Sequence, residues 1–528
     1  MMRSASTPVL IVAALASAAI QHAPAAAQTS TPPAPPAVVI ALDSGQISAP
    51  ADTGGIRVFK GIPYAQAPVG ALRWKPAAPV APWAGVRPAT SFGPACLQRT
   101  KLTARELAAS GAAPEQVSED CLTLNVWTPT KMDKPAPVMV WLHGGGHTAG
   151  SGSLAFYDGS SFARDGVILV SINYRLGLMG YFAHPALTRE AGKGAELGGY
   201  GTTDQIQALR WVQKNIAAFG GDPANVTVFG ESAGAQSTLT LLATPSAKGL
   251  FARAIAESAY ISGKFPTLAE AETIGATVAV TLGLPGASAT AEQLRSLSGE
   301  ALIAAQEKLP PGPIVDGALL PLNPAMAFAR GKILHVPLMI GTNSDEGSLI
   351  VAREPTSVLA EGTPDLVAFG KSYYGQGAAT DAALARKLWR DWTFTAPTRW
   401  VARKASASQP IWLYHYDYTP ERLRKIWDGV PHGYEVPFVF DSLSRVAQFA
   451  PLLTDADRAS IATVHSCWVS FARSGTPACT GAPVWPAYTA DADQLMDFGV
   501  TQTIKSNFDK PILDKIETGI VALGKLKP

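Results

Sequence analysis

The sequence predicts an α/β fold, with a central, mostly parallel β-sheet covered by helices on both faces. The run APVMVWL at 136–142 is apolar throughout, as expected of a strand buried on both faces. Residues 203–219 place their apolar side chains on one helical face. Residues 226–229 predict a strand, and Gly230-Glu-Ser-Ala-Gly and a helical pattern follow it. Strands that alternate with helices in this way favour a parallel sheet.

Composition fits one large globular domain that spans residues 38–528. The chain has 528 residues, of which 47% are hydrophobic and 16% are charged, and its formal net charge is +2. Mean hydropathy is +0.12, which permits a large core. No long run of like charge exists, so neither nucleic acid nor an anionic membrane surface is an implied partner. No internal repeat or linker follows residue 40, and the sequence does not indicate the oligomeric state.

The N-terminus has the pattern of a secretory signal peptide over residues 1–27. A short positive start precedes an apolar run at 9–20, and small residues at 25–27 offer a cleavage site. The apolar run is too short to span a membrane, and no later stretch is long enough either. Residues 28–37 form a Pro-rich mature N-terminus. We therefore expect an exported protein that is periplasmic or secreted.

The chain contains four cysteines, which allow three pairings. An oxidising compartment favours the use of all four in disulfides. Proximity in the sequence suggests the pairs Cys96–Cys121 and Cys467–Cys479. No C-x-x-C motif is present, so zinc and thioredoxin-like sites have little support.

The other expected elements follow from periodicity and turn residues. An N-terminal antiparallel ribbon is expected from residues 38–49 and 53–60. Further strands are expected at 122–127, 166–174, from 254 onward, at 336–340 and at 411–418. Helices are expected over 267–310 and 356–407, with a closing helix at 458–473.

The central motif is G-x-S-x-G around Ser232, between a predicted strand and a predicted helix. The turn is so tight that the positions two before and two after the serine have no room for a side chain, and Gly230 and Gly234 occupy them. Such a turn exposes the serine hydroxyl above the sheet edge, at the N-terminus of the next helix. A nucleophilic serine requires a base, an acid and an oxyanion site elsewhere in the chain.

A Gly-rich turn, His143-Gly-Gly-Gly-His, directly follows the predicted strand at 136–142. Glycines at the carboxyl end of a strand let backbone N–H groups approach a charge that develops on a substrate oxygen. This pattern therefore predicts an oxyanion hole, in which the loss of one donor raises the barrier by about 3–4 kcal/mol.

Two alternatives for this turn find little support. The glycine spacing at 144–149 formally fits a dinucleotide fingerprint, but Asp165 comes before the next strand, and that strand ends without an acid. A metal site at His143 and His147 is disfavoured because their spacing suits a helix while three glycines lie between them. No cofactor and no metal are expected.

The base and the acid are sought downstream of the serine, in the order serine, acid, histidine. His415 lies within an expected strand and His465 within the closing helix, whereas His432 lies in a loop after the last strong strand. A catalytic base at the carboxyl edge of the sheet requires a loop, so His432 is the predicted base. The strand at 336–340 leads to Asp345 and Glu346, and position alone does not decide between these two acids.

Together these motifs resemble those of the type-B carboxylesterases, the cholinesterase and carboxylesterase branch of the α/β-hydrolases. The resemblance covers nearly the whole mature chain, and so many motifs in the same order are highly specific. They are Phe59-Lys-Gly-Ile-Pro-Tyr-Ala, Glu119-Asp-Cys-Leu-Thr-Leu-Asn-Val, the His-Gly-Gly-Gly turn, Asn173-Tyr-Arg, Asp204-Gln, Phe219-Gly-Gly-Asp-Pro, Phe229-Gly-Glu-Ser-Ala-Gly, Ser344-Asp-Glu-Gly-Ser and His432-Gly-Tyr-Glu.

The resemblance implies an α/β-hydrolase fold and a serine-hydrolase site. It assigns Ser232 as the nucleophile, Glu346 as the acid and His432 as the base, and so decides between the two acids. The implied oxyanion donors are the backbone N–H groups of Gly145, Gly146 and Ala233.

The resemblance also bears on residues around this site. Cys96–Cys121 matches the first disulfide loop of the family, whereas Cys467–Cys479 follows from the even number of cysteines. Arg73 and Glu119 resemble a buried structural ion pair. Glu231 either orients water for deacylation or makes a structural hydrogen bond, and both alternatives stay open.

Two departures from the family pattern concern the substrate. Cholinesterases keep a tryptophan in the first disulfide loop to face a quaternary ammonium, but no aromatic residue lies between Cys96 and Cys121. An aromatic often found three residues after the acid is Leu349 here. We therefore do not expect choline esters as substrates. His147 stands where the family usually has an aromatic, commonly Phe, and its role is open.

The sequence thus predicts an exported serine hydrolase that cleaves small-molecule carboxylic esters through an acyl-enzyme, without cofactor or metal. An amidase, a lactonase or an esterase specialised for a toxin, pesticide or aryl ester would carry the same residues. The alternative from another class is a non-catalytic binding module. Such relatives typically lack a triad member, whereas this chain keeps all three.

Overall fold

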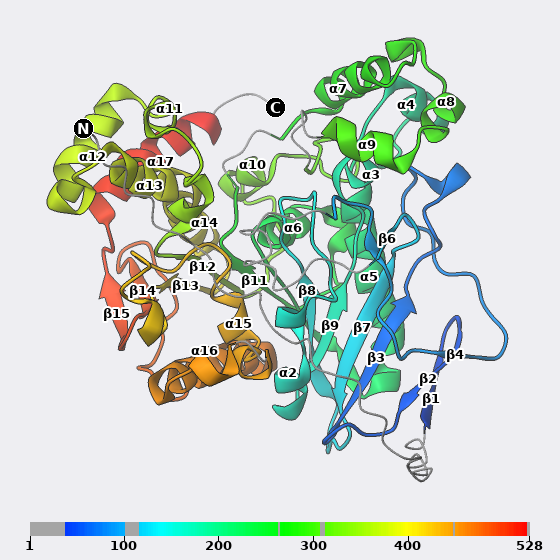
Figure 1. Ribbon diagram of the computed structural model, residues 1–528, viewed down its shortest axis with the longest axis horizontal. Coiled ribbons are helices and arrows are strands. Elements are labelled where there is room, and N and C mark those ends of the chain that lie inside the picture. The colour runs from blue at the N-terminus through cyan, green and yellow to red at the C-terminus, as the bar shows by residue number, and fades with distance from the viewer. Residues whose placement is uncertain (1–36, 101–115, 262–264, 307–311, 447–448, 525–528) are drawn as a thin grey trace, which may run out of the picture. The chain divides into compact units, whose positions relative to one another are not determined.

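A computed structural model of the chain describes residues 37–100, 116–261, 265–306, 312–446 and 449–524. The expected signal peptide (1–27) and all but the last residue of the Pro-rich segment (28–37) lie outside the described residues. Figure 1 shows a large twisted sheet with helices on both of its faces. This is the α/β arrangement that the alternating pattern predicts.

The central sheet contains ten strands in the described part of the chain. Strands β14 to β9 in the order below run parallel, β15 pairs antiparallel at one edge, and β7 and β3 pair antiparallel at the other. In spatial order they are β15 (Gln502–Ser506), β14 (Gln494–Phe498), β13 (Ile411–Tyr416), β12 (Leu338–Asn343), β11 (Arg253–Glu257), β10 (Gly221–Glu231), β8 (Ala136–Leu142), β9 (Ile168–Ile172), β7 (Thr123–Pro129) and β3 (Ile56–Pro63).

Helices connect the strands. Two groups of helices extend beyond the sheet, at the upper left (α11, α12 and α13) and the upper right (α7, α8 and α9) of Figure 1. A π-helical turn (Asp391–Thr395) joins α13 to α14. The α-helices of the described residues are α2 (Ser160–Arg164), α3 (Gly177–Gly180), α4 (Pro185–Ala191), α5 (Tyr200–Asn215), α6 (Ala233–Leu242), α7 (Leu268–Thr281), α8 (Ala291–Arg295), α9 (Gly299–Gln306), α10 (Pro324–Ala329), α11 (Pro355–Leu359), α12 (Pro364–Tyr374), α13 (Asp381–Arg390), α14 (Ala396–Ala405), α15 (Val436–Val439), α16 (Asp455–Ser474) and α17 (Lys510–Gly524).

Strand β8 divides the core into two layers. Val138, Val140 and Leu142 pack into the layer that also contains apolar residues of α5, α6, α14 and α17. Met139 and Trp141 point to the opposite face, into the layer formed with α2, α15 and α16. All five side chains have no exposed surface. The uniformly apolar sequence of this strand reflects burial on both faces.

The predicted N-terminal ribbon is partly wrong. The first half of the predicted ribbon folds on itself: β1 (Ala37–Leu42) and β2 (Gly45–Pro50) form an antiparallel hairpin, with β4 (Val86–Pro88) beside β2. The second half of the predicted ribbon, however, becomes β3 in the main sheet, antiparallel to β7. Phe59 and Ile62 of β3 are buried in the main core. Alternation identifies a half-buried strand but does not determine its partner.

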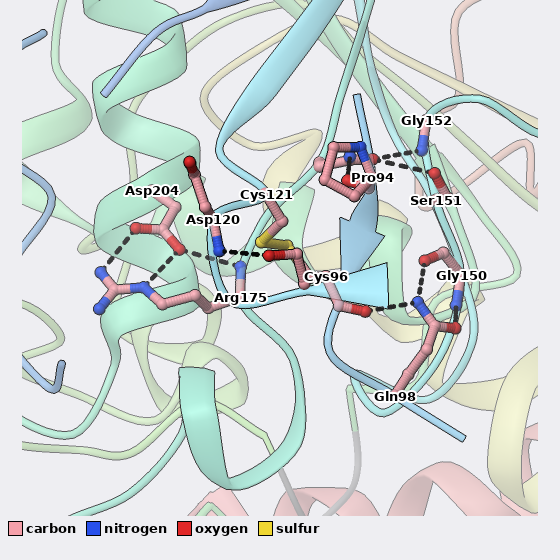
Figure 2. The surroundings of a disulfide bond; sticks show 12 residues. Pro94, Cys96, Gln98, Asp120, Cys121, Gly150, Ser151, Gly152, Arg175 and Asp204 are labelled. Atoms are coloured by element: carbon pink, nitrogen blue, oxygen red, sulfur yellow. Dashed lines mark hydrogen bonds and ion pairs between the residues drawn. A yellow bond between two sulfur atoms is a disulfide. The ribbon is translucent and has the colours of Figure 1, made fainter. Parts of the chain in front are cut away.

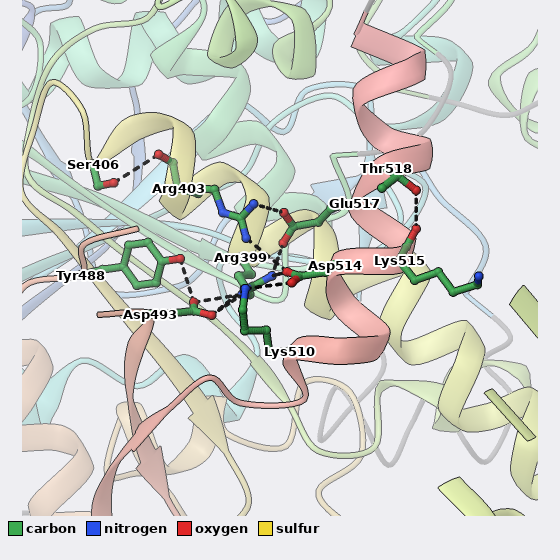
Figure 3. Close-up of polar contacts among 10 residues, drawn as sticks. All are labelled: Arg399, Arg403, Ser406, Tyr488, Asp493, Lys510, Asp514, Lys515, Glu517 and Thr518. Carbon is green, nitrogen blue, oxygen red and sulfur yellow. Dashed lines mark hydrogen bonds and ion pairs between the residues drawn. The ribbon is translucent and has the colours of Figure 1, made fainter. Parts of the chain in front are cut away.

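Helix α16 is not the last element, because β14, β15 and α17 follow it. The C-terminal helix α17 is joined to α14 by a network of charged side chains (Figure 3). Arg399 on α14 donates to Asp493 (2.9 Å), Asp514 (2.8 Å) and Glu517 (2.7 Å). We call Arg399, Arg403, Asp493, Asp514 and Glu517 the clamp cluster.

The described residues contain both expected disulfides, Cys96–Cys121 and Cys467–Cys479. Next to the first one, Gln98 receives a hydrogen bond from the Gly150 N–H and donates to the Gly150 carbonyl (2.8 and 2.7 Å; Figure 2). The disulfides are typical of an oxidising, extracellular environment. Among the helices of the described residues, none has the length and apolarity needed to cross a membrane.

Candidate active site

Ser232 lies in a strained turn between strand β10 and helix α6. Its backbone adopts φ 55° and ψ −120°, which is unusual for a residue with a side chain. A Cβ added to Gly230 would lie 2.5 Å from the Leu142 carbonyl oxygen, and one added to Gly234 would lie 1.9 Å from it. Only glycine fits at either position, because the turn packs against the end of β8. Strain of this kind persists where the surroundings enforce it, often at functional sites.

The Gly-rich turn after β8 runs alongside the serine. A Cβ on Gly144 would lie 2.5 Å from a Glu231 carboxylate oxygen and 3.2 Å from the Ser232 Cβ. Gly145 and Gly146 are exposed and have positive φ angles of 107° and 61°. Both glycines are thus open to solvent, one and two residues after the position that packs against Ser232.

The predicted acid and base are in direct contact. Glu346 Oε2 lies 2.5 Å from His432 Nδ1. Its other oxygen accepts hydrogen bonds from the Ser258 hydroxyl (2.5 Å) and the Asn343 N–H (2.8 Å). Glu346 is fully buried, whereas Asp345 forms an ion pair with Arg386. The geometry therefore separates the two acids between which position alone did not decide.

The loops that carry the acid and the base are bonded to each other. The Val430 N–H donates to the Ser344 hydroxyl (2.8 Å), and the His432 N–H donates to the Ser348 hydroxyl (3.0 Å). The Asp345 N–H donates to the Val430 carbonyl (3.0 Å). These bonds fix the two loops, and with them the backbones of Glu346 and His432, relative to each other.

The other two histidines downstream of the predicted acid lie elsewhere. His415 in β13 contacts Asp497 (2.8 Å), and His465 in α16 contacts the Val439 carbonyl (2.6 Å). Within the described ranges, no group of three or more His, Cys, Asp or Glu side chains is arranged to hold a metal ion.

Ser232 and His432 are not hydrogen-bonded in this structure. His432 Nε2 instead lies 3.1 Å from Glu231 Oε1, and the Ser232 hydroxyl has no hydrogen bond among the described residues. Catalytic hydrogen bonds of free enzymes are often long and tighten only with substrate bound. The structure thus brings Glu346, His432 and Glu231 together and places Ser232 directly after Glu231.

Two further carboxylates near His432 received no role from the sequence. Glu435 accepts a hydrogen bond from the Asn343 side chain, and Glu257 accepts one from the Trp468 indole (2.8 Å). Glu435 stands in the His432-Gly-Tyr-Glu motif, and Glu257 ends strand β11, so both positions are visible in the sequence. We call Glu231, Glu257, Glu346, His432 and Glu435 the acid-rich cluster.

Burial and crowding of like charges shift the pKa values in the acid-rich cluster. Burial raises the pKa of Glu231, against the positive charge of His432, and burial with the charge of Glu435 raises the pKa of Glu257. Burial also raises the pKa of Glu435. For His432, burial favours a lower pKa, but the charges of Glu231 and Glu346 outweigh it and raise the pKa to about 9.

An apolar cavity of about 280 Å³ lies beside the His432 loop. Val430 and Gly433, which flank His432, belong to its wall, and among the described residues Arg422 is its one charged lining residue. A Cβ on Gly433 would lie 3.3 Å from Glu231 Oε1, so the wall also approaches the acid-rich cluster. The aromatic side chains of the wall are Phe156, Tyr418, Trp427, Tyr434, Phe438 and Phe449.

A second group of aromatic rings contacts His432 itself. The Phe394 ring, on the π-helical turn, lies 5.2 Å from the His432 ring. Trp389 and Tyr260 pack against Phe394 at 5.6 and 6.4 Å. Tyr260 is 42% exposed, so this group reaches the surface.

Comparison with known sequences finds the family that the motifs resemble. A sequence profile described as the carboxylesterase family matches residues 41–365 and 370–514. This chain belongs to the carboxylesterase family. The carboxylesterase is 36% identical over 501 residues to fumonisin B1 esterase of Sphingopyxis macrogoltabida, an alignment that covers 90% of this chain and 88% of the relative. It is 36% identical over 474 residues to para-nitrobenzyl esterase of Bacillus subtilis (strain 168), covering 86% and 93%.

Solved structures agree with this assignment. A para-nitrobenzyl esterase superposes on the carboxylesterase with a TM-score of 0.77 at 32% identity, over 90% of this chain and 99% of that one. A carboxylesterase of Geobacillus stearothermophilus gives a TM-score of 0.78 at 32% identity, over 90% and 98%. The chain has the α/β-hydrolase fold and is a carboxylic ester hydrolase that acts on small-molecule esters.

Proposed function

We propose that this carboxylesterase works through an acyl-enzyme on Ser232, with His432 as general base and acid and Glu346 as the residue that orients His432. The observation that carries the proposal is the 2.5 Å contact between Glu346 and His432, on loops that adjoin the strained Ser232 turn. A nucleophile, a base and an orienting acid in this relation are typical of serine hydrolases.

In the first half of the reaction, Ser232 Oγ attacks the ester carbonyl carbon while His432 Nε2 takes the hydroxyl proton. His432 first turns from Glu231 toward Ser232. The carbonyl oxygen becomes an oxyanion and accepts hydrogen bonds from the backbone N–H groups of Gly145, Gly146 and Ala233. His432 then gives its proton to the alcohol oxygen as the C–O bond breaks, and the acyl group stays on Ser232.

In the second half, water attacks the acyl carbon and His432 takes one of its protons. The oxyanion forms again in the same hole and collapses, Ser232 Oγ leaves, and His432 returns the proton to it. Glu346 stabilises the imidazolium that exists in each half, because its carboxylate lies 2.5 Å from Nδ1. The charge of Glu231, which lies 3.1 Å from Nε2 before His432 turns, adds to this stabilisation from nearby.

For the substrate, we propose a neutral ester with an apolar group of aromatic size. The cavity beside the His432 loop and the rings around Phe394 support this. Arg422 lines the cavity, and within the described residues no acidic side chain does. The positive charge of Arg422 therefore disfavours a quaternary ammonium in the cavity. Two relatives are named for fumonisin B1 and para-nitrobenzyl esters. We expect kcat/KM for benzyl acetate to exceed that for acetylcholine by about tenfold or more.

We further propose that the protein is exported, with residues 1–27 removed as a signal peptide. The two disulfides support an oxidising destination. N-terminal sequencing of the mature protein from its native host should give Gln28 as the first residue. A mature N-terminus at Met1 would contradict export by this route.

Substitution of the nucleophile tests the catalytic assignment. Ser232→Ala should lower turnover of 4-nitrophenyl acetate by about 10⁴-fold or more, with an unchanged circular dichroism spectrum. A fluorophosphonate should label Ser232 in the native protein and leave the variant unlabelled. Near-normal turnover in the variant would reject the assignment, and absence of both turnover and adduct in the folded native protein would favour a non-catalytic binding module.

A further inference from the structure

The histidine that follows the three glycines has an unusual setting. His147 has a positive φ of 58° and is only 2% exposed. A left-handed backbone costs a residue with a side chain about 1–2 kcal/mol, so contacts elsewhere must hold it. The His147 carbonyl accepts a 2.6 Å hydrogen bond from the Gly177 N–H, and its ring packs edge-on against Tyr181 at 5.0 Å.

The ring of His147 ends a buried hydrogen-bond chain. Its Nε2 lies 3.1 Å from the Ser237 hydroxyl oxygen, which also accepts a 2.9 Å hydrogen bond from the Gln205 side chain. Ser237 and Gln205 are 1% and 0% exposed. Gln205 belongs to α5 and Ser237 to α6, so these hydrogen bonds connect the Gly-rich loop to two helices of the core.

Ser237 lies on the helix that carries one of the proposed oxyanion donors. Ser237 lies one helical turn after Ala233, the first residue of α6. The proposed oxyanion hole has two halves: the N–H groups of Gly145 and Gly146 on the loop, and that of Ala233 on the helix. His147 directly follows the loop donors and bonds to the helix that carries the other donor. Gln98 holds the far end of the same loop at Gly150 (Figure 2).

The His147 ring carries no charge at neutral pH. Burial, together with the charge of His143, lowers its pKa to about 3. A neutral ring adds no net charge to the oxyanion hole, and its bond to Ser237 gives it a geometric role.

We propose that His147 is a positioning residue that sets the distance between the two halves of the oxyanion hole through its bond to Ser237. This inference rests on the proposed function. Oxyanion donors act only when they lie within hydrogen-bond distance of the oxygen in the transition state. Loss of the His147–Ser237 bond should therefore weaken transition-state binding and leave ground-state binding nearly unchanged.

The decisive variant is His147→Phe, which keeps an aromatic ring and removes its nitrogens. We expect kcat for 4-nitrophenyl acetate to fall about tenfold with KM within about twofold, less than the 10²–10³-fold loss for a missing donor. Inhibition by a trifluoromethyl ketone, whose adduct places an oxyanion in the hole, should weaken by a similar factor. His147→Gln, which keeps a polar group near the Nε2 position, should recover most of the loss.

Ser237→Ala tests the partner. If the two residues act through one bond, the double variant with His147→Phe should be no slower than His147→Phe alone. His184→Phe is a matched control, because His184 is a fully buried histidine that caps α4. We expect it to lower Tm and to leave kcat and the inhibition constant unchanged.

Normal kcat and normal ketone inhibition in His147→Phe would overturn the inference, as would kcat losses that multiply in the double variant. A loss confined to Tm would also overturn it, because it would show a purely structural role. These outcomes are distinct from failure of the proposed function, which active Ser232→Ala protein would show.

Discussion

The acid-rich cluster is a buried group of charged side chains and the clamp cluster a partly buried one, and they differ in how their charges are balanced. In the clamp cluster, three carboxylates face two arginines, and Lys510 forms a further ion pair with Asp514 (Figure 3). Burial favours a higher pKa for Asp493 and Asp514, but the hydrogen bonds and charge of Arg399, with Lys510 acting on Asp514, outweigh it and lower both. In the acid-rich cluster, four buried carboxylates accompany one imidazole, two of them in contact with it, and the pKa values of Glu231, Glu257 and Glu435 are raised.

This difference separates a structural role from a catalytic one. Every carboxylate of the clamp cluster is paired with a cation, so the clamp cluster joins α14 to α17 and offers no unpaired base for proton transfer. In a group with an excess of buried carboxylates, the pKa values of the carboxylic acids are raised, so they exchange protons readily. The excess negative charge also raises the pKa of a neighbouring base. Such shifts are common in active sites. Substitutions at four positions test the comparison, from the largest expected effect to the smallest.

Glu346→Gln should abolish most activity with little change in stability. The glutamine oxygen still accepts from Ser258 and Asn343, but its amide presents N–H to His432 Nδ1 and so favours the wrong tautomer. We expect kcat for 4-nitrophenyl acetate to fall about 10⁴-fold, with Tm nearly unchanged. A loss of kcat smaller than tenfold would remove Glu346 from the proposed mechanism.

Arg399→Met should lower stability and leave activity unchanged, the reverse of Glu346→Gln. It leaves Asp493 and Glu517 buried with too little positive charge, so the free energy of unfolding in urea should fall by about 3–5 kcal/mol. The kcat of the folded fraction should equal that of the native protein. Arg399→Lys should be intermediate, because it keeps the charge and loses the planar fork. Unchanged stability in Arg399→Met would show that the clamp cluster contributes nothing.

Glu231→Gln should shift the pH profile. His432 acts as a base only when neutral, so kcat/KM rises with pH through its pKa. Removal of the Glu231 charge lowers the raised pKa of His432, and the acid limb should move about one unit toward lower pH, equivalent to about 1.4 kcal/mol. A limb that stays in place or moves upward would show that Glu231 does not act on His432.

Asp514→Asn should have the smallest effect. The Asp514 side chain is 42% exposed, and exposed ion pairs contribute at most about 1 kcal/mol. We expect Tm to change by no more than a few degrees and kcat to stay constant. A loss of stability as large as that of Arg399→Met would mean that burial does not decide which members of the clamp cluster matter.

Local requirements were readable in the sequence. The strand at 136–142 is confirmed residue for residue, because burial on both faces leaves an uninterrupted apolar run. The turn around Ser232 needs glycine at 230 and 234, since a Cβ at either position would strike the backbone at the end of β8. The family and its ester chemistry follow from many such motifs in one order.

Long-range partners were decided only by the tertiary structure. The contact between Glu346 and His432 joins residues 86 apart in the sequence, and their position in the sequence left Asp345 as an equal candidate. The place of β3 in the main sheet, the strands after α16 and the gathering of Glu257 and Glu435 near His432 were likewise absent from any local pattern. Sterics within a turn act between neighbours, so they appear in the sequence. Pairing and burial depend on which distant segments meet, and the bond from His147 to Ser237 exists only because the fold brings its loop against α6.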